Sequence, residues 1–378
     1  MERLGDRPGV GWATPQRLVR RAGRPWAPAP GTLRAVLDVV RLDFDPTIAL
    51  LGLTVRLETL ALAAVILLVL VLAALGAGRM RARLDQEAEG PAAGSGRLRR
   101  DDLILIAFGA VPGAVVGGRI GYGLVHLDYY RTNPGLLVDP GQGGLTLTLA
   151  VILGVVGALA VAGLLAAPIG RWLHVAAGPL LMGLGLGKLG MVLGADGQGQ
   201  FSSASWATMY PRPGLWQSPN PGSAALPSQA LEGGLVLLAA ALMIAVPFLL
   251  RLRLRRWRQI VRPGLAPRRE WAVLMGFRRF LTALCLWAVA RLAAAFTWRD
   301  ARVVGPLGVE QLLLIGVLAG CLAVLIAARL RDRRRARAAA GAAGRAAARG
   351  VAPTTDESGL PEPRSFAEPG RLKEPGRS

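Results

Sequence analysis

The sequence of 378 residues is poor in cysteine and in histidine. Its two cysteines, Cys285 and Cys321, both lie within apolar runs and form no CxxC pair. This placement excludes a disulfide framework and a cysteine-based zinc site. The two histidines, His126 and His174, each stand alone in the sequence. A histidine-rich metal centre or catalytic cluster is therefore excluded as well, and we expect neither a metal nor a cofactor.

Acidic residues are also scarce, because 24 of them accompany 45 lysines and arginines and leave a formal net charge of +21. Such an excess can indicate nucleic-acid binding, but here the arginines concentrate between apolar runs and in the terminal segments. That distribution is typical of topology signals beside membrane helices, so we expect no nucleic-acid partner. The first forty residues lack the unbroken apolar core of a cleavable signal peptide. We therefore expect the first hydrophobic helix to direct membrane insertion.

Hydrophobic residues are abundant, at 52% of the chain. They form seven stretches long enough to cross about 30 Å of hydrocarbon, which takes about 20 residues. The stretches cover residues 57–77, 103–122, 144–168, 173–194, 231–250, 272–296 and 306–329. Pro168 separates the third from the fourth, since a proline and the combined length argue against one continuous helix. The sequence therefore predicts an all-α integral membrane protein with seven transmembrane helices.

The gaps between these stretches predict the orientation of the chain. Arginines crowd the gaps after the first and fifth stretches and the segment after the seventh, whereas the alternate gaps carry few cations. Under the positive-inside bias the arginine-rich gaps are cytoplasmic, which places the N-terminus outside and the C-terminus in the cytoplasm. The first forty-six residues are arginine-rich and run against this rule, but three later segments outweigh them.

Composition divides the chain into three parts. They are a basic N-terminal arm (1–46), a membrane domain (47–330) and a basic C-terminal tail (331–378). From about residue 338 the tail is low in large apolar residues, which predicts disorder. We find no internal repeat of the kind that would favour a transporter.

Charged residues inside apolar stretches are the candidate functional residues, because a charge in hydrocarbon must pair, meet a ligand or reach the interface. Lys188 lies in GLGLGKLGMVLGADGQGQF (183–201), where a charge near the bilayer centre costs about 2.5 to 3.5 kcal/mol. Under the predicted topology Arg119, Lys188 and Arg291 fall in the outer half of the membrane or at its surface. Three cations at one depth indicate an anion site, and the anions available there are lipid phosphates.

Each of these residues also has a simpler structural interpretation. Arg119 and Arg291 could extend to the outer headgroups. Lys188 could pair with Asp196 only if the helix bends, since eight helical residues separate the two by about 12 Å. Glu232 could be a helix-start residue favoured by the helix dipole, and the glycines near Lys188 could serve close helix packing. The sequence leaves both interpretations open.

Six motifs occur in a fixed order along the chain. They are GGRIGYGLVHLDYY, QGGLTLTLAVILG, GKLGMVLGADGQG, WATMYP, LPSQALEGG and the arginine of AVARLAAAF. In order and spacing they resemble the motifs of prolipoprotein diacylglyceryl transferases, over about residues 45–328. The resemblance implies a multi-pass protein of the bacterial inner membrane that acts on membrane lipid. It would move the diacylglyceryl group of phosphatidylglycerol onto the lipobox cysteine of a prolipoprotein signal peptide and release glycerol phosphate.

The resemblance implies roles for particular residues. Arg119, Lys188 and Arg291 match the family's cations and would hold the lipid phosphate. The supporting residues would be Gly199, Gln229 and Glu232, to which we add Gln311 because it opens the seventh apolar stretch. The nucleophile belongs to the substrate, so the site must help to deprotonate a thiol whose ordinary pKa is near 8.5.

The chain departs from the family where a proton acceptor is expected. The family's SFHGG reads TLTLA here, which places the family's histidine on Thr148. In the fourth stretch the family's motif has an arginine that falls on Lys188 and a later glutamate that falls on Asp196. The family's tyrosine in the first stretch falls near Glu58. The glutamate that follows the sixth-stretch arginine by four residues is replaced by Ala295.

Two hypotheses follow from these departures. In the first, the chain is an active transferase with a rebuilt site, in which Asp196, Glu58 or Thr148 accepts the thiol proton. In the second, it is a catalytically silent member of the family that binds lipid or a lipoprotein precursor.

Overall fold

The computed structural model describes residues 39–50, 52–87, 98–139, 144–211, 221–261 and 270–348. Contacts within the chain divide it into two units, Met1–Leu322 and Ala323–Ser378, which we describe separately. The sequence boundary between them falls inside the last helix.

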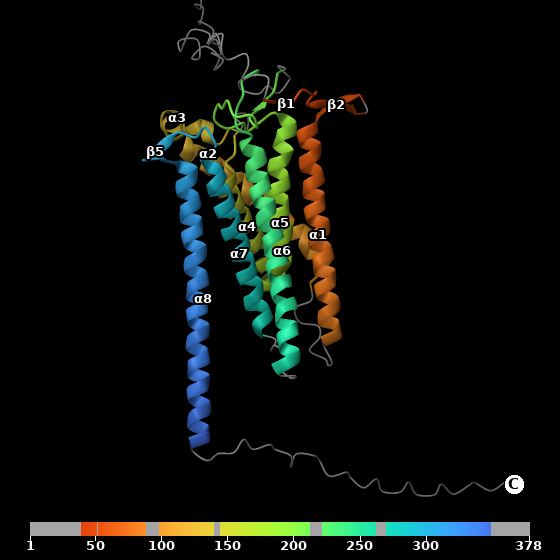
Figure 1. The fold of residues 1–378 in the computed structure, drawn as a ribbon, viewed down its shortest axis with the longest axis vertical. Helices are drawn as coiled ribbons and strands as arrows, with labels where there is room; N and C mark the ends of the chain where they lie inside the picture. The colour runs from red at the N-terminus through yellow and green to blue at the C-terminus, as the bar shows by residue number, and fades with distance from the viewer. Residues whose placement is uncertain are drawn as a thin grey trace, which may run out of the picture. The chain divides into compact units, whose positions relative to one another are not determined.

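Long helices make up most of the described first unit (Figure 1). In chain order they are α1 (Leu57–Glu87), α2 (Arg100–Val125), α4 (Leu147–Leu164), α5 (Ile169–Gly190), α6 (Ser228–Val261), α7 (Glu270–Ala295) and the start of α8 (Val309–Ala348). Each overlaps one of the apolar stretches in the sequence. The division between the third and fourth stretches is confirmed, because α4 ends at Leu164 and Pro168 is the N-cap of α5. Shorter helices lie in the connections: α3 (Leu127–Thr132), η4 (Pro134–Leu137) and η6 (Met191–Gly194).

Six helices in the described part of the chain are long and apolar enough to cross a membrane, namely α1, α2, α4, α5, α6 and α8. Helix α7 is more polar, since Arg278, Arg279 and Arg291 all lie on it. The chain is therefore a mostly helical, multi-pass membrane protein, as its composition predicts. The count of seven spans and the orientation of the termini stay predictions.

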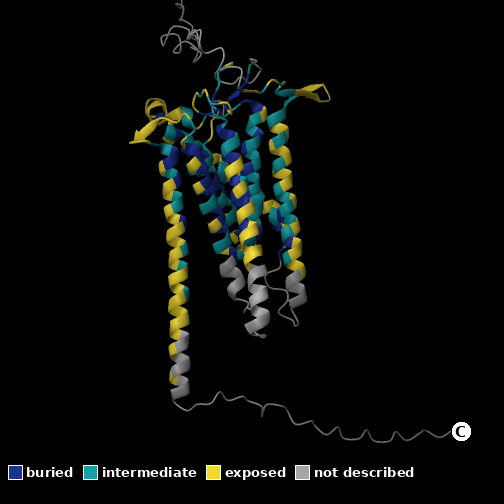
Figure 2. Cartoon of the chain, in the orientation of Figure 1, coloured by how far each residue is buried: buried dark blue, intermediate teal, exposed yellow. Residues whose placement is uncertain are grey.

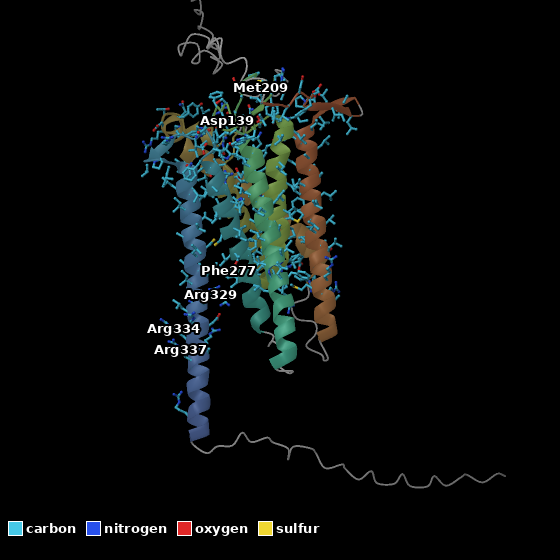
Figure 3. All side chains as sticks on the ribbon, viewed as in Figure 1. Asp139, Met209, Phe277, Arg329, Arg334 and Arg337 are labelled. Atoms are coloured by element: carbon cyan, nitrogen blue, oxygen red, sulfur yellow. The ribbon has the colours of Figure 1, made fainter. Side chains whose placement is uncertain are left out.

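Short strands pair at one end of the first unit (Figure 1). The pairs are β1 (Val40–Arg41) parallel to β4 (Thr208–Met209), β2 (Thr47–Leu50) antiparallel to β3 (Leu53–Arg56), and β5 (Arg302–Val304) antiparallel to β6 (Leu307–Gly308). At this end α1, α4, α6 and α8 begin, and α2, α5 and α7 finish; we call it the capped end. Asp139 and Met209 lie there (Figure 3). Strands of two to four residues are too short to produce a periodic pattern in the sequence.

Helices α2 and α4 pack as a close pair because glycines line their contact. A Cβ added at Gly113 would overlap the carbonyl oxygen of Leu153, and one at Gly157 would overlap that of Gly109. Small residues on both helices let the two backbones approach, as is typical of helix contacts inside membranes.

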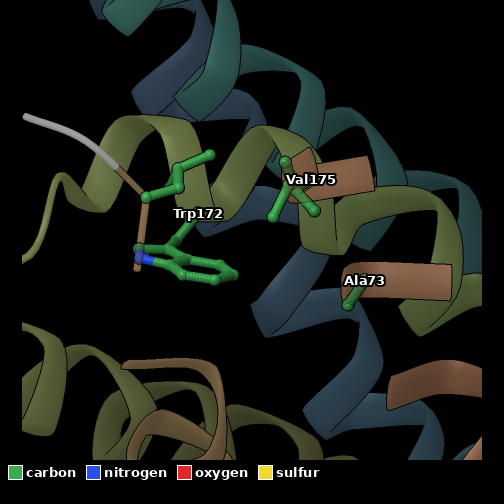
Figure 4. Packing of buried hydrophobic residues seen from close by; sticks show 5 residues of the cluster. Ala73, Trp172 and Val175 are labelled. Atoms are coloured by element: carbon green, nitrogen blue, oxygen red, sulfur yellow. The ribbon is translucent and has the colours of Figure 1, made fainter. Parts of the chain in front are cut away.

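Helix α5 packs against α1, α6 and α7, and so lies at the centre of the remaining helices. Ala73 of α1 joins Trp172 and Val175 of α5 in one buried cluster (Figure 4). Many residues on the outward faces of the helices are exposed, as expected of surfaces that contact lipid (Figure 2). Between the α2–α4 pair and helices α1, α5 and α7 lies an apolar cavity of about 380 Å³.

The described part of the second unit is the rest of α8, which continues to Ala348. Arg329, Arg334 and Arg337 are exposed on it (Figure 3). The stretch 331–348, which belongs to the predicted disordered tail, is therefore helical in the structure. Its many alanines and arginines explain the difference, since both residues favour helix. Residues 349–378 of the tail and residues 1–38 of the basic arm lie outside the described residues.

Candidate functional site

Four buried charged side chains meet near the capped end, one each from α5, α6, α7 and α8. They are Lys188, Glu232, Arg291 and Glu310, and none is more than 9% exposed. Glu232 Oε1 accepts a hydrogen bond from Arg291 Nη1, and Glu232 Oε2 lies 3.4 Å from Lys188 Nζ. Arg291 Nη2 lies 3.4 Å from Glu310 Oε2. We call these four residues the charge cluster.

Thr148 brings α4 into contact with the charge cluster. Its side chain is fully buried, and its hydroxyl donates a hydrogen bond to Glu310 Oε2. The same hydroxyl oxygen accepts a hydrogen bond of 3.4 Å from Arg291 Nε. The hydroxyl proton of Thr148 is directed at the Glu310 carboxylate. In this hydrogen bond Thr148 is therefore the donor and Glu310 the acceptor.

The start of α8 is fixed by its third residue, Gln311. The amide of Gly308 donates to Gln311 Oε1 at 2.7 Å, and Gln311 Nε2 donates to the carbonyl oxygen of Ala295 at 3.3 Å. The first bond closes the start of α8, and the second ties it to the end of α7. Glu310 lies in the first turn of α8, where the helix dipole favours a negative charge.

The charge cluster contains two cations and two carboxylates, which balance one another. Balance of this kind is required because an unpaired buried charge is strongly destabilising. The structure thus brings together Lys188 and Arg291, two cations of the predicted phosphate-holding set, and pairs them with acids. Lys188 meets Glu232 of a neighbouring helix, and so satisfies its charge without the helix bend that pairing with Asp196 would need.

Arg119 makes its contacts with the connection that follows α3. Its guanidinium donates to the carbonyl oxygens of Leu137 at 2.5 Å, Leu136 at 2.8 Å and Asp139 at 2.9 Å. Its central carbon lies 5.9 Å from the centroid of the Tyr130 ring. These contacts anchor the connection to the end of α2.

A second group of charges gathers at the start of α1. Arg56 Nη2 lies 2.9 Å from Glu58 Oε2 and 3.4 Å from Asp196 Oδ2. Asp196 follows the left-handed Ala195 (φ 59°), which ends η6 and turns the chain toward α1. A Cβ at Gly194 would overlap the Glu58 carboxylate, so a larger residue there would displace that side chain. Two of the predicted proton acceptors therefore share one arginine, which the sequence analysis did not single out.

Gly199 holds the connection before α6 against the exit of α7. Its amide donates to the carbonyl oxygen of Leu226 at 2.8 Å. A Cβ at this position would overlap Ser228 Oγ and the carbonyl oxygen of Thr297. Only glycine fits this approach, which explains structurally why the position keeps the family's residue.

Gln229 is fully buried in the first turn of α6. Its amide oxygen and nitrogen have no hydrogen-bond partner in the described part of the chain. The neighbouring Tyr210 hydroxyl donates to the carbonyl oxygen of Val192 at 2.9 Å. Burial is the main reason that the pKa of Tyr210 is raised to about 12, so this phenol stays protonated at neutral pH.

The segment that follows α7 contacts the charge cluster and its surroundings. Lys188 Nζ lies 4.6 Å from the centroid of the Trp298 ring, a cation–π contact. Arg299 Nε donates to the carbonyl oxygen of Gly199, and its guanidinium carbon lies 4.0 Å from the Phe201 ring centroid. No residue of this segment is among the candidates predicted from the sequence. A tryptophan, an arginine and an aspartate that follow the sixth apolar stretch were the available signal.

A profile of the prolipoprotein diacylglyceryl transferase family matches residues 46–327, which is most of the chain. The chain belongs to this family. A phosphatidylglycerol–prolipoprotein diacylglyceryl transferase of Methylibium petroleiphilum is 34% identical over 152 residues, which are 38% of this chain and 54% of the relative. The chain thus matches about half the length of that relative.

The charge cluster can be compared with the motifs of the prolipoprotein diacylglyceryl transferase family. Where the family's motif carries a glutamate one turn after the sixth-stretch arginine, this chain has Ala295. In the structure Arg291 takes a carboxylate from another helix instead, that of Glu310. Glu310 opens the seventh stretch at the same depth, but sequence order alone does not show that it faces Arg291.

Proposed function

We propose that this chain transfers the diacylglyceryl group of phosphatidylglycerol to the lipobox cysteine of prolipoprotein signal peptides. Family membership and the relative's name support the class of reaction. The observation that carries the proposal is the charge cluster, which joins Lys188 and Arg291 within one buried site. Fixed cations of this kind stabilise a phosphate leaving group.

We further propose seven transmembrane helices in a bacterial inner membrane, with the N-terminus outside and the C-terminus in the cytoplasm. Helix α7 is the span that brings the number from six to seven, and Arg291 is tolerated on it because two carboxylates face it. In this orientation the capped end faces outward. The charge cluster then lies where outer-leaflet lipid and a translocated signal peptide meet.

The reaction breaks one S–H bond and one C–O bond and forms one C–S bond. The substrate thiol gives up its proton, and its sulfur attacks the glycerol carbon that carries the phosphate. Glycerol phosphate leaves with the bonding electrons and gains one negative charge. Lys188 and Arg291 stabilise that charge, while Glu232 and Glu310 hold the two cations in place before the lipid arrives.

The apolar cavity suits one acyl chain of the lipid. Its volume of about 380 Å³ lies within the usual range for small-molecule sites. On α4 it is lined from Leu147, the neighbour of Thr148, to Ala162. The fifteen helical steps from Leu147 to Ala162 correspond to about 22 Å, so an acyl chain could extend from the charge cluster along the helix bundle.

Complementation tests the proposal. The chain is expressed in cells depleted of their own diacylglyceryl transferase, and a model lipoprotein is examined by mass spectrometry for a diacylglyceryl thioether. We expect modified lipoprotein with the natural chain, about 10²-fold less with Arg291→Ala, which removes a transition-state cation, and full modification with Arg131→Ala. Arg131 is the matched control because its side chain is 68% exposed on α3. Unmodified lipoprotein, with the protein inserted and folded, would contradict the proposal and leave a lipid-binding family member.

A further inference from the structure

Asp300 is a charged residue at the charge cluster to which no role has yet been given. It follows Trp298, which contacts Lys188, and Arg299, which is fixed to Gly199. On its other side a Cβ at Gly308 would lie 3.5 Å from the Asp300 Cβ. Asp300 is therefore held between the exit of α7 and the entry of α8, at the capped end of the charge cluster.

The exposure of Asp300 differs from that of the charge cluster. The four cluster residues are buried, whereas Asp300 is exposed at the capped end. A substrate arriving from that side reaches Asp300 before it reaches Glu232 or Glu310. The carboxylates of Glu232 and Glu310 are in addition already paired with Arg291.

The electrostatic surroundings couple Asp300 to the charge cluster. The charged groups around it are Lys188, Glu232, Arg291 and Glu310 on four helices, with Arg299 and Arg302 on its own segment. Although Asp300 is exposed, the neighbouring protein removes part of the water around its carboxyl and so raises its pKa, and the charge of Glu310 raises it further. Arg291 and Lys188 act in the opposite direction. A raised pKa makes a carboxylate a better proton acceptor, provided the pH stays above it.

We infer that the Asp300 carboxylate accepts the proton of the substrate thiol. The S–H bond breaks as the C–S bond forms, the proton moves to Asp300, and the electrons of the C–O bond leave with glycerol phosphate. Asp300 becomes neutral while the leaving group gains one negative charge, so the total charge is unchanged. This inference rests on the proposed function, and it assigns the role that the sequence analysis sought at Asp196, Glu58 and Thr148.

The test is a pH–rate profile of the purified full chain in phosphatidylglycerol vesicles with a synthetic lipobox peptide. We expect kcat/KM of the natural chain to fall on the acid side as Asp300 takes up a proton. Asp300→Asn should lower kcat about 100-fold and remove this acid limb, because an amide cannot accept the proton. Asp300→Glu should keep part of the rate. Asp128→Asn is the control, since Asp128 is a fully exposed aspartate that also lies at the capped end.

Chemical rescue separates proton transfer from a structural role. Formate added to Asp300→Ala should restore rate in proportion to the formate anion, whereas a folding defect would not respond. If the natural chain is active and the Asp300→Asn variant keeps the full rate or the acid limb of the profile, the inference is overturned and the proposed function stands. A folded natural chain that transfers no diacylglyceryl group would overturn both.

Discussion

At the scale of single residues, Lys188 shows how a cation is tolerated inside an apolar helix. Its ammonium lies near a carboxylate of α6 and under an aromatic ring from the exit of α7. Both contacts come from segments remote in sequence, so the helix that carries Lys188 needs no acid of its own. The charge is therefore satisfied by the fold, and a lipid phosphate is not required to hold Lys188 in place.

Removing Glu232 should destabilise the protein. Glu232→Met leaves Lys188 and Arg291 with one carboxylate instead of two, and breaking a buried pair costs about 3 to 5 kcal/mol. Adding Lys188→Met restores the balance of charge, so the double variant should unfold at a higher temperature than Glu232→Met alone. Thermal unfolding in detergent micelles measures both. Strictly additive losses would show that Lys188 and Glu232 are not coupled.

At the scale of elements, the helices play two different roles. Helices α2 and α4 form a tight pair through their glycines, and α5 is surrounded by α1, α6 and α7. The apolar cavity lies between these two groups, while Thr148 of α4 connects them to α8 at the capped end. A change in the spacing of α2 and α4 should therefore shift Thr148 and alter the geometry of the charge cluster.

Gly113→Ala tests this spacing. Its methyl group would overlap the backbone of α4, and overpacking of this kind costs about 1 to 3 kcal/mol. Gly163→Ala is the control on the same helix pair, because a Cβ there meets no atom within 4 Å. We expect a lower unfolding temperature and a lower transfer rate for Gly113→Ala only. Equal behaviour of the two variants would count against a tight α2–α4 contact.

At the scale of the whole molecule, the sequence predicts the helices well and their partners poorly. Apolar length and Pro168 locate the spans because hydrocarbon demands about 20 apolar residues per helix. The candidates Lys188, Glu232 and Arg291 stand out because charge in lipid is rare. Which acid meets which cation depends on helix rotation and packing, which no spacing encodes. For that reason the pairing of Glu310 and the position of Asp300 become visible only in the folded structure.

The predicted orientation of the chain can be tested with two engineered cysteines. Asp128→Cys lies at the capped end and should react with a membrane-impermeant maleimide added to intact cells. Arg345→Cys lies in the exposed part of α8 in the second unit and should react only after the membrane is opened. The natural Cys285 and Cys321 lie within helices and give the background. Labelling of Arg345→Cys in intact cells would contradict the predicted topology and place the C-terminus outside.

The balance of two cations and two carboxylates also limits how the site can receive a lipid. A phosphate diester brings one negative charge into a site whose own charges sum to zero. A cation or a proton that enters with the lipid removes this excess of negative charge, and where it is a proton, lipid binding and proton uptake are thermodynamically linked. Lipid affinity should then rise as the pH falls, while proton removal from the thiol is favoured as the pH rises. Such a protein would work best between the pH at which lipid binding weakens and the pH at which the thiol keeps its proton, and the compartment that its capped end faces would have to provide that pH.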